Sequence, residues 1–291
     1  MQMAIVTLPY NVQGRGQGGA SGPGALLAAG LTQRIMAQGH SIAGIREVRL
    51  TGEEEKRYGG WNRVGLAGGH LADLVAQSSQ EGSFVLALLA DCNGVLGVLG
   101  GLQRGERPTW PKRVGLVWID AHGDYNTPET SLSGMLGGMP VAVAAGKGLH
   151  RLRLRNGLKV PLQSPDIVMM GMRDLDDLER QALEEDEIEI LREQDLIARS
   201  PRVSEAMERL SQREDIIYVH VDLDILDPRV APAAGLPSPG GLTGRQLGQA
   251  LKAMLAYPKV GALGVVSYRA DADEDGRTLQ EVLDAISGAM A

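Results

Sequence analysis

Two carboxylates and an imidazole, Asp120, His122 and Asp124, alternate along the chain directly after the apolar run at residues 114–119. In an extended backbone every second side chain points to the same face, so we expect these three groups to converge. Oxygen and nitrogen donors gathered at the end of a buried strand are typical of a divalent-metal site. The alternative is a turn in which the aspartates accept hydrogen bonds from backbone amides.

A second pair of carboxylates, Asp222 and Asp224, alternates in the same way and closes the apolar run at residues 216–221. An Asp-Pro turn at Asp227 and Pro228 then ends the strand. Burying two such carboxylates without partners is very costly, so a cation is expected between them. Together the two strand ends predict a site that can bridge a pair of metal ions.

The elements that must position these groups alternate between apolar strands and helices. Strands are expected at residues 4–8, 84–89, 114–119, 166–170, 216–221 and 260–266, and helices at residues 24–38, 62–77, 204–212 and 243–256. Such alternation is typical of a parallel sheet covered by helices on both faces, with ligands bound beyond the carboxyl ends of the strands. We predict a three-layer α-β-α fold with a mostly parallel central sheet. No linker-like stretch divides residues 1–291, which indicates a single domain.

Composition narrows the class of protein. A hydrophobic content of 43% with only 3% aromatic residues predicts an aliphatic core, and a net charge of −7 argues against a nucleic-acid partner. The one short basic run, residues 151–155, is interpreted as a solvated face or a subunit contact. The sequence shows neither a leader-like start nor a long apolar stretch, so secretion and membrane insertion are not expected. A single cysteine cannot form an internal disulfide, which fits a cytoplasmic protein.

The motifs resemble those of the arginase/agmatinase (ureohydrolase) superfamily. The pattern Asp-Ala-His-x-Asp matches residues 120–124, and x-Asp-x-Asp-x-x-Asp-Pro matches residues 221–228. Stretches at residues 8–23 and 235–243 resemble the superfamily's opening and its loop after the second metal motif, so the resemblance covers nearly the whole chain. It implies an arginase-like α-β-α fold, two manganese ions held by six side chains, and a homo-oligomer, either a trimer or a hexamer.

The resemblance assigns five of those metal ligands to residues of the two motifs: Asp120, His122, Asp124, Asp222 and Asp224. A histidine is expected at the sixth position, where Cys92 stands instead. A thiolate can bind a metal, and a nearby dication lowers its pKa. Manganese prefers oxygen and nitrogen, so we expect this position to bind more weakly or to hold another divalent ion. The alternative is that Cys92 is only a small buried side chain.

One further histidine lies beside the second motif. His220 precedes Asp222 by two residues, so strand alternation would place both on one face. Such a histidine is most often a hydrogen-bonded core residue. The alternatives are that it supports a metal ligand or replaces the missing imidazole.

Polar residues downstream of the first motif resemble the arginase pocket for an amino acid. The resemblance assigns the α-carboxylate and α-amino groups to a stretch that includes Asn126, Ser131 and Ser133, and the α-amino group also to Asp176. Glu179 matches a further acidic position in the same pocket wall. Hydroxyl and amide donors suit a carboxylate, and an acid suits an ammonium group. The alternative for Asp176 is a helix N-cap, which its position before residues 178–182 also fits.

Two further positions depart from the arginase pattern. Gly137 stands where arginases have a histidine thought to shuttle protons, and Ser267 stands where they have a glutamate near the substrate. A serine cannot make the bidentate contact of a carboxylate with a protonated guanidinium. An N-hydroxyguanidine has a much lower pKa than a guanidinium, so it can bind in the neutral form.

The leading hypothesis is therefore a binuclear-metal amidinohydrolase acting on arginine or, preferably, Nω-hydroxyarginine, with Asp124 as the proton carrier. It would release ornithine together with urea or hydroxyurea. The alternatives are an agmatinase or another guanidino-acid hydrolase, and a catalytically silent protein that keeps the fold. No nucleic acid or membrane partner is expected.

Overall fold

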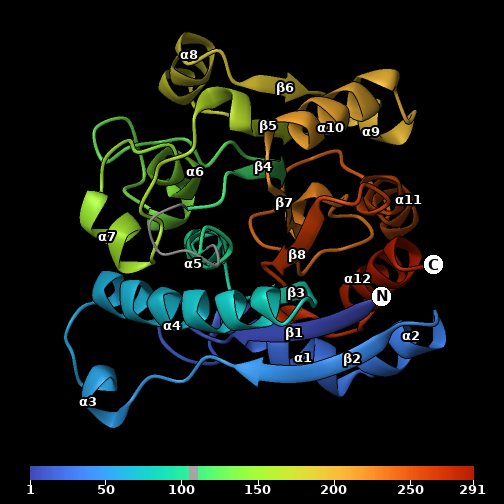
Figure 1. Cartoon of the computed structure of the whole chain (residues 1–291), viewed down its shortest axis with the longest axis horizontal. Helices are drawn as coiled ribbons and strands as arrows, with labels where there is room; N and C mark the ends of the chain where they lie inside the picture. The colour runs from blue at the N-terminus through green and yellow to red at the C-terminus, as the bar shows by residue number, and fades with distance from the viewer. Residues whose placement is uncertain (105–110) are drawn as a thin grey trace.

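A computed structural model describes residues 1–104 and 111–291. Within these residues eight strands form one sheet, in the order β2-β1-β3-β8-β7-β4-β5-β6, and all neighbouring strands are parallel (Figure 1). The predicted α/β fold around a mostly parallel sheet is confirmed. The strands are β1 (Gln2–Leu8), β2 (Ser41–Glu47), β3 (Phe84–Leu89), β4 (Val114–Ile119), β5 (Ile167–Met170), β6 (Glu189–Leu191), β7 (Ile216–Asp222) and β8 (Val260–Val266).

Helices cover both faces of the sheet. The core of one face includes side chains of α1 (Gly22–Ala28), α2 (Leu31–Ala37), α9 (Glu193–Ile197), α10 (Pro201–Arg213), α11 (Gly244–Leu255) and α12 (Arg277–Ala289). The core of the other includes side chains of α4 (Gly60–Gln80), α5 (Gly94–Leu102), α6 (Pro140–Ala144) and α8 (Asp177–Glu185). The remaining α-helices of the described chain, α3 (Gly52–Glu55) and α7 (His150–Arg155), are short. Short 3₁₀ turns are η1 (Gly18–Ser21), η2 (Leu136–Gly138), η3 (Ser164–Asp166), η4 (Leu223–Ile225) and η5 (Ala270–Ala272).

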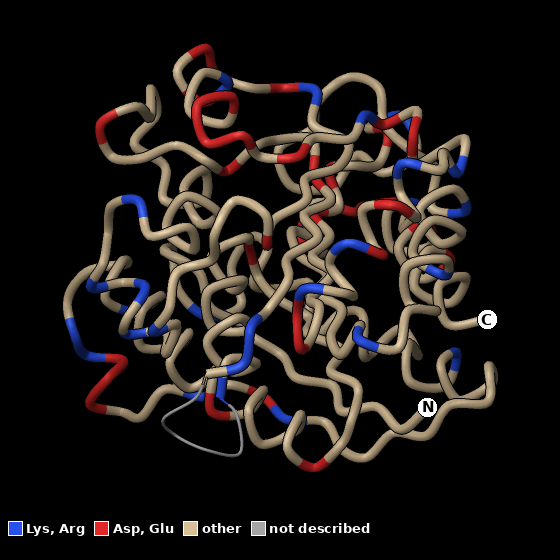
Figure 2. The backbone as a smooth tube through the Cα atoms, turned by 45° about the horizontal axis from the view of Figure 1, so that its top comes forward, with Lys and Arg blue, Asp and Glu red and all other residues tan. Residues whose placement is uncertain are grey.

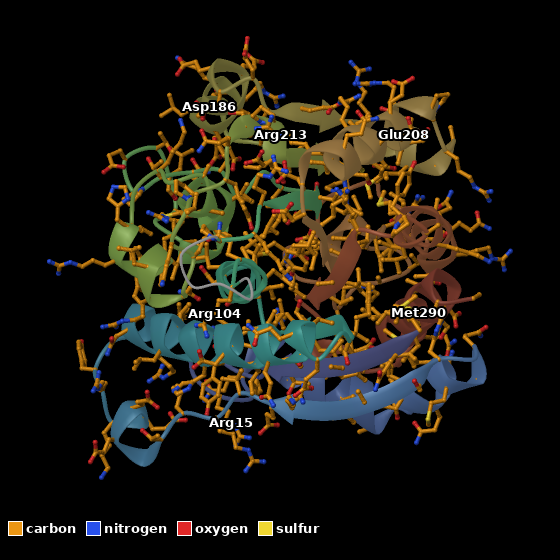
Figure 3. All side chains as sticks on the ribbon, viewed as in Figure 1. Arg15, Arg104, Asp186, Glu208, Arg213 and Met290 are labelled. Atoms are coloured by element: carbon orange, nitrogen blue, oxygen red, sulfur yellow. The ribbon has the colours of Figure 1, made fainter. Side chains whose placement is uncertain are left out.

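The sheet is buried on both faces, as its apolar strands predict. Successive residues of β1 point to opposite cores, with Ile5 packed on the α1 side and Val6 on the α4 side. Side chains fill the space between the sheet and its helices (Figure 3). The buried hydrophobic residues are mostly aliphatic, which agrees with the low aromatic content.

Three local predictions differ from the structure. The edge strands β2 and β6 were not expected, because β2 is only half-buried along its length and β6 has 3 residues. The helix expected at residues 24–38 is two helices, α1 and α2. They are separated at Gly30, whose φ of 84° is a left-handed conformation that glycine adopts without strain.

Segments with charged residues of both signs are distributed over the fold (Figure 2). Within the described residues, every helix is too short or too polar to cross a membrane. The aspartates that the sequence motifs single out, Asp120, Asp124, Asp222 and Asp224, are buried.

Candidate metal centre

The ends of two neighbouring strands bring the first two carboxylates together. Strands β4 and β7 pair with Trp118 opposite His220 and Ile119 opposite Val221, so Asp120 and Asp222 leave the sheet side by side. Trp118 faces the core of α4 and α5, and Asp120 lies two residues beyond it. Cys92, on the link between β3 and α5, reaches the same place and is 5% exposed.

Turns, rather than a continuing strand, bring the other groups in, so the expected strand alternation is wrong here. Strand β4 ends at Ile119, His122 donates its backbone N–H to Asp120 Oδ1 at 2.7 Å, and Asp124 has a left-handed φ of 47°. Asp224 lies in η4 and donates its backbone N–H to Asp222 Oδ1 at 3.0 Å. Asp120 and Asp222 thus accept amide hydrogen bonds and also converge with other candidate ligands, so for these two residues both interpretations of the sequence hold together.

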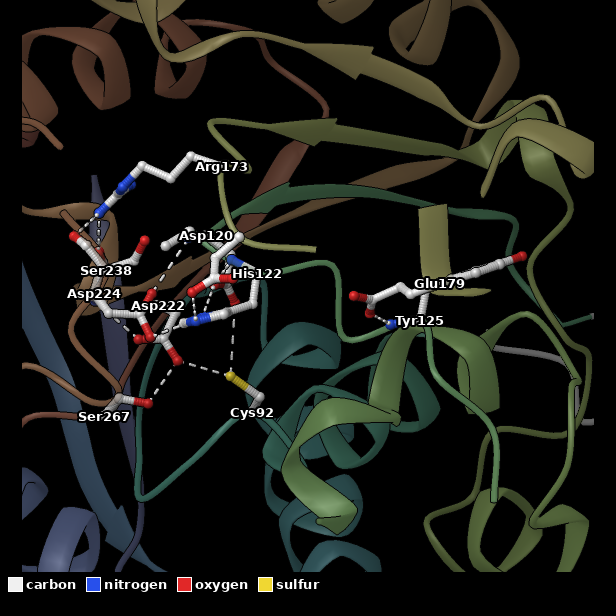
Figure 4. Close-up of polar contacts among 12 residues, drawn as sticks. Cys92, Asp120, His122, Tyr125, Arg173, Glu179, Asp222, Asp224, Ser238 and Ser267 are labelled. Carbon is white, nitrogen blue, oxygen red and sulfur yellow. Dashed lines mark hydrogen bonds and ion pairs between the residues drawn. The ribbon is translucent and has the colours of Figure 1, made fainter. Parts of the chain in front are cut away.

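The converging side chains form two groups that share Asp120 (Figure 4). One group is Cys92, Asp120 and Asp222, and the other is Asp120, His122 and Asp224; within each, the candidate ligand atoms lie within 4.8 Å of one another. Cys92 Sγ is 2.8 Å from Asp222 Oδ2, and His122 Nδ1 is 3.2 Å from Asp224 Oδ2. Asp124 is buried nearby but belongs to neither group.

Burial and the repulsion between neighbouring carboxylates raise the pKa values of these aspartates. Burial raises the pKa of Asp120 and Asp124 well above the usual range, and neighbouring carboxylates add to the rise. For Asp222, burial and then Asp224 raise the pKa to about 7. Burial lowers the pKa of His122, but Asp120 and Asp224 outweigh that effect and raise it to about 12. Four buried aspartates around one imidazole carry an excess of negative charge that divalent cations would compensate.

The donor set fits a pair of divalent metal ions. Carboxylate oxygens and an imidazole suit manganese and other divalent transition metals, and a thiol that ionises on binding can complete one of the positions. The two groups share a carboxylate, which is how one aspartate could contact two ions. The residues present therefore agree with the predicted metal centre. Cys92, from the link between β3 and α5, lies beside Asp120 and Asp222, as the predicted sixth ligand should.

Ser267 points into this cluster rather than away from it. Its Oγ donates to Asp222 Oδ2 at 2.6 Å, the same oxygen that Cys92 Sγ approaches. Ser267 has a left-handed φ of 69°, which is unfavourable for a serine and indicates a local constraint. Gly235 lies so close that a Cβ there would be 3.0 Å from Asp224 Oδ2, and its N–H donates to the Ser267 carbonyl at 2.8 Å.

The predicted substrate loop lies beside the centre and is internally bonded. Asn126 Nδ2 donates to Asp176 Oδ2 at 3.1 Å. Asp176 occupies the N-cap position of α8, but its side chain makes no capping hydrogen bond, so the alternative prediction of a side-chain cap is wrong. Ser131 Oγ and Ser133 Oγ each accept one backbone N–H, at 3.0 and 3.2 Å. Ser131 is half-buried and Ser133 is exposed, so both hydroxyls can donate to a ligand.

Two other residues expected at the pocket have different surroundings. Glu179 is buried and accepts the backbone N–H of Tyr125 at 2.8 Å, apart from the metal cluster in Figure 4. It braces the segment that follows Asp124. Gly137 lies in η2, where a Cβ added to the glycine would lie 3.8 Å from the sulfur of Met135. The glycine offers no imidazole at the position where the resemblance leads us to expect one.

His220 is a core residue beneath the centre. Its ring stacks on Trp118 with centroids 4.1 Å apart and planes 2° apart, and Nδ1 lies 2.8 Å from the Tyr218 hydroxyl. Burial lowers its pKa to about 3, so it is neutral. It belongs to neither candidate metal group, which agrees with the interpretation of His220 as a hydrogen-bonded core residue.

Arg173 contacts the metal centre, and the sequence motifs did not reveal this. Its guanidinium donates to the Asp224 carbonyl at 2.7 Å. The available signal was an arginine three residues after the end of strand β5, at the same sheet edge as both aspartate motifs.

The fold and the two donor groups define a candidate metal-dependent enzyme of the α-β-α class. The profile of the arginase family matches residues 1–290. Arginase from Bacillus caldovelox is 30% identical over 99% of this chain and 97% of its own length, and arginase from Brevibacillus brevis is 31% identical over 84% and 82%.

Solved structures agree with the family match. Arginase from Bacillus cereus superposes with a TM-score of 0.86 at 26% identity, covering 100% of this chain and 99% of its own. Arginase from Entamoeba histolytica, solved in complex with L-ornithine, gives a TM-score of 0.84 at 26% identity, covering 100% and 98%. The chain belongs to the arginase family. Its assignment to the metal-dependent hydrolases of linear amidines is confirmed.

Proposed function

We propose that this protein hydrolyses the guanidino group of arginine or an arginine derivative, with Nω-hydroxyarginine favoured, and releases ornithine with urea or hydroxyurea. The observation that carries the choice of substrate is the contact of Ser267 Oγ with Asp222 Oδ2 at 2.6 Å. The hydroxyl that replaces the expected glutamate is directed at a carboxylate of the cluster. It therefore offers no negative charge to a protonated guanidinium, whereas a neutral N-hydroxyguanidine does not require one.

The metal centre in this proposal consists of two manganese ions. Their ligands would come from the two donor groups and Asp124, namely Cys92, Asp120, His122, Asp124, Asp222 and Asp224. When bound, such a pair of ions lowers the pKa of a water molecule toward neutrality and thereby supplies hydroxide for hydrolysis. The thiol makes the Cys92 position the weaker manganese site, or one that another divalent ion fills.

The protein's own groups would orient the substrate and move the proton. The hydroxyls of Ser131 and Ser133 would donate to the α-carboxylate, while Asn126 and Asp176 would receive the α-amino end. Asp124 is buried beside both donor groups, with burial raising its pKa, so it can carry a proton to the departing amine of ornithine. Glu179 would position Asp124 indirectly, because it accepts the backbone N–H of Tyr125, the next residue.

The names of the relatives support the amino-acid part of this proposal. They are arginases, and the Entamoeba histolytica relative was solved with L-ornithine, which is the amino-acid product expected from either substrate. Family resemblance also leads us to expect a homo-oligomer, a trimer or a hexamer, in the cytoplasm, with all of residues 1–291 in one domain. An agmatinase would make less use of a loop that presents donors for a carboxylate.

The deciding experiment measures ornithine release from manganese-loaded protein with arginine and with Nω-hydroxyarginine under identical conditions. A clear preference for the hydroxylated substrate is expected. A preference for arginine would show that an arginase tolerates serine at position 267 and glycine at position 137. If neither yields ornithine, agmatine and other guanidino acids are tested next, and inactivity with all of them would indicate a silent relative.

A further inference from the structure

Arg173 uses its guanidinium to bind backbone carbonyls at the metal centre. Its Nη2 donates to the carbonyl oxygens of Asp224 at 2.7 Å and Ser238 at 3.1 Å, and its Nε donates to that of Pro239 at 3.1 Å (Figure 4). Within the described residues, its guanidinium has no carboxylate within 4.0 Å. The planar fork of an arginine can satisfy several acceptors in fixed directions, which a lysine cannot do.

The backbone of the same residue is bonded to the other metal motif. The N–H groups of Arg173 and Asp174 donate to the Ala121 carbonyl at 2.8 and 3.0 Å, between Asp120 and His122. The Ala121 N–H in turn donates to Asp224 Oδ1 at 3.3 Å. One residue therefore joins the turn of Asp120 and His122, through its main chain, to the turn of Asp222 and Asp224, through its side chain.

We propose that Arg173 is a positioning residue that sets the separation of the two metal-binding turns and holds the segment at residues 235–240 against them. The two turns come from strands β4 and β7, and neither turn continues its strand, so strand pairing alone does not fix their geometry. The Arg173 contacts supply that constraint. The inference rests on the proposed metal centre but not on the choice of substrate.

Charge and position predict opposite effects for the loss of this side chain. Arg173 is a cation close to a site for cations, so its removal would tighten metal binding if electrostatic repulsion were its main effect. If Arg173 positions the turns, its removal weakens metal binding, by about 10- to 100-fold as for other residues that orient metal ligands. The direction of the change therefore separates the two explanations.

The test compares Arg173→Met with Arg153→Met, a matched control in α7. Arg153 is buried, whereas Arg173 is half-buried, and it likewise donates to backbone carbonyls, through Nη1 to those of Leu158 at 2.7 Å and Lys159 at 2.8 Å, outside the metal centre. Metal affinity and stoichiometry are measured by titration calorimetry with Mn²⁺, and thermal unfolding is followed with and without the metal. Both variants should lower the Tm of the metal-free protein, but only Arg173→Met should lose metal affinity and most of the metal-induced rise in Tm.

A third variant, Arg173→Lys, keeps the positive charge and keeps the test informative if Arg173→Met does not fold. It should bind Mn²⁺ more weakly than the wild type, because one ammonium cannot replace the fork. Unchanged or tighter binding in both Arg173 variants, or equal losses in Arg153→Met, would overturn the inference. A wild-type protein that binds Mn²⁺ but hydrolyses no guanidino compound would refute the proposed function alone, whereas a wild type that binds no metal would overturn both.

Discussion

The protonation of Cys92 provides a direct test of whether it is a metal ligand or only a buried side chain. Burial, and next the charge of Asp222, raise the pKa of the thiol well above its usual value, so the metal-free protein holds a neutral thiol at pH 7 to 8. A thiol that ligates a metal must ionise. Metal binding should therefore release a proton from Cys92, and the variant Cys92→Ala has no such proton to release.

The size of the effect follows from the number of protonated donors. His122, with a pKa raised to about 12, also holds a proton that it must lose to bind a metal. The wild type therefore releases one proton from each of these two residues, in addition to those of Asp120 and Asp124, whose pKa values are also raised. At about pH 8, above the Asp222 pKa of about 7, Cys92→Ala should release about one proton fewer. Each proton corresponds to about a tenfold change in affinity per pH unit, or about 1.4 kcal/mol, so the variant's affinity should rise less steeply with pH.

The assay is titration calorimetry with Mn²⁺ at one pH in buffers of different ionisation enthalpy, which gives the number of protons released. His220→Asn is the matched control: burial lowers the pKa of His220 to about 3, so it carries no proton to lose, and its loss should change neither the proton count nor the metal content. An equal proton count for wild type and Cys92→Ala would refute ligation by the thiol. A lower metal content in His220→Asn would instead give the histidine a role at the metal.

Three further outcomes are expected. Asp124→Asn should lower ornithine release by about 100-fold or more and weaken metal uptake without abolishing it, because both donor groups remain complete without this ligand; unchanged turnover would remove it as the proton carrier. Ser133→Ala should raise the KM for arginine about fivefold and leave that for agmatine unchanged, and equal effects would show that Ser133 does not contact the carboxylate. Burial, and then Asp166, raise the pKa of Glu214 from 4.5 to about 7, so the native state binds the extra proton and loses stability as pH rises through this range. Glu214→Gln should therefore increase the free energy of unfolding at about pH 8 by on the order of 2 kcal/mol and have little effect at about pH 4. Urea unfolding at both pH values measures the gain, and an equal gain at the two would contradict the raised pKa of Glu214.

The sequence predicts the strands that carry the site because they are uninterrupted apolar runs. The expected ranges 114–119 and 216–221 differ from β4 and β7 by at most one residue. A strand that is buried on both faces has apolar side chains at every position, so its first and last residues can be located from the ends of the apolar run. The exposed edge strand β2 has no such signal, since its side chains alternate between exposed and half-buried.

The geometry of the site was less predictable because turns define it. A spacing of two residues looks the same in a strand and in a turn, yet Asp124 is left-handed and Asp224 lies in η4. Those conformations depend on contacts between distant segments, such as that between Arg173 and the Asp224 carbonyl. Ligand identity could thus be predicted from residue type and order, whereas the arrangement required knowledge of which segments meet.

The two departures at Cys92 and Ser267 look independent in the sequence but meet at one oxygen, Asp222 Oδ2, with distances of 2.8 and 2.6 Å. Burial and Asp224 raise the pKa of Asp222, and the contacts from both Cys92 and Ser267 oppose that rise. A glutamate at position 267 would instead add another negative charge to a cluster whose carboxylates already raise one another's pKa. Loss of function has no reason to place two donors on one ligand oxygen. The arrangement therefore favours a metal centre adapted to a different guanidino substrate over the decay of an ordinary one.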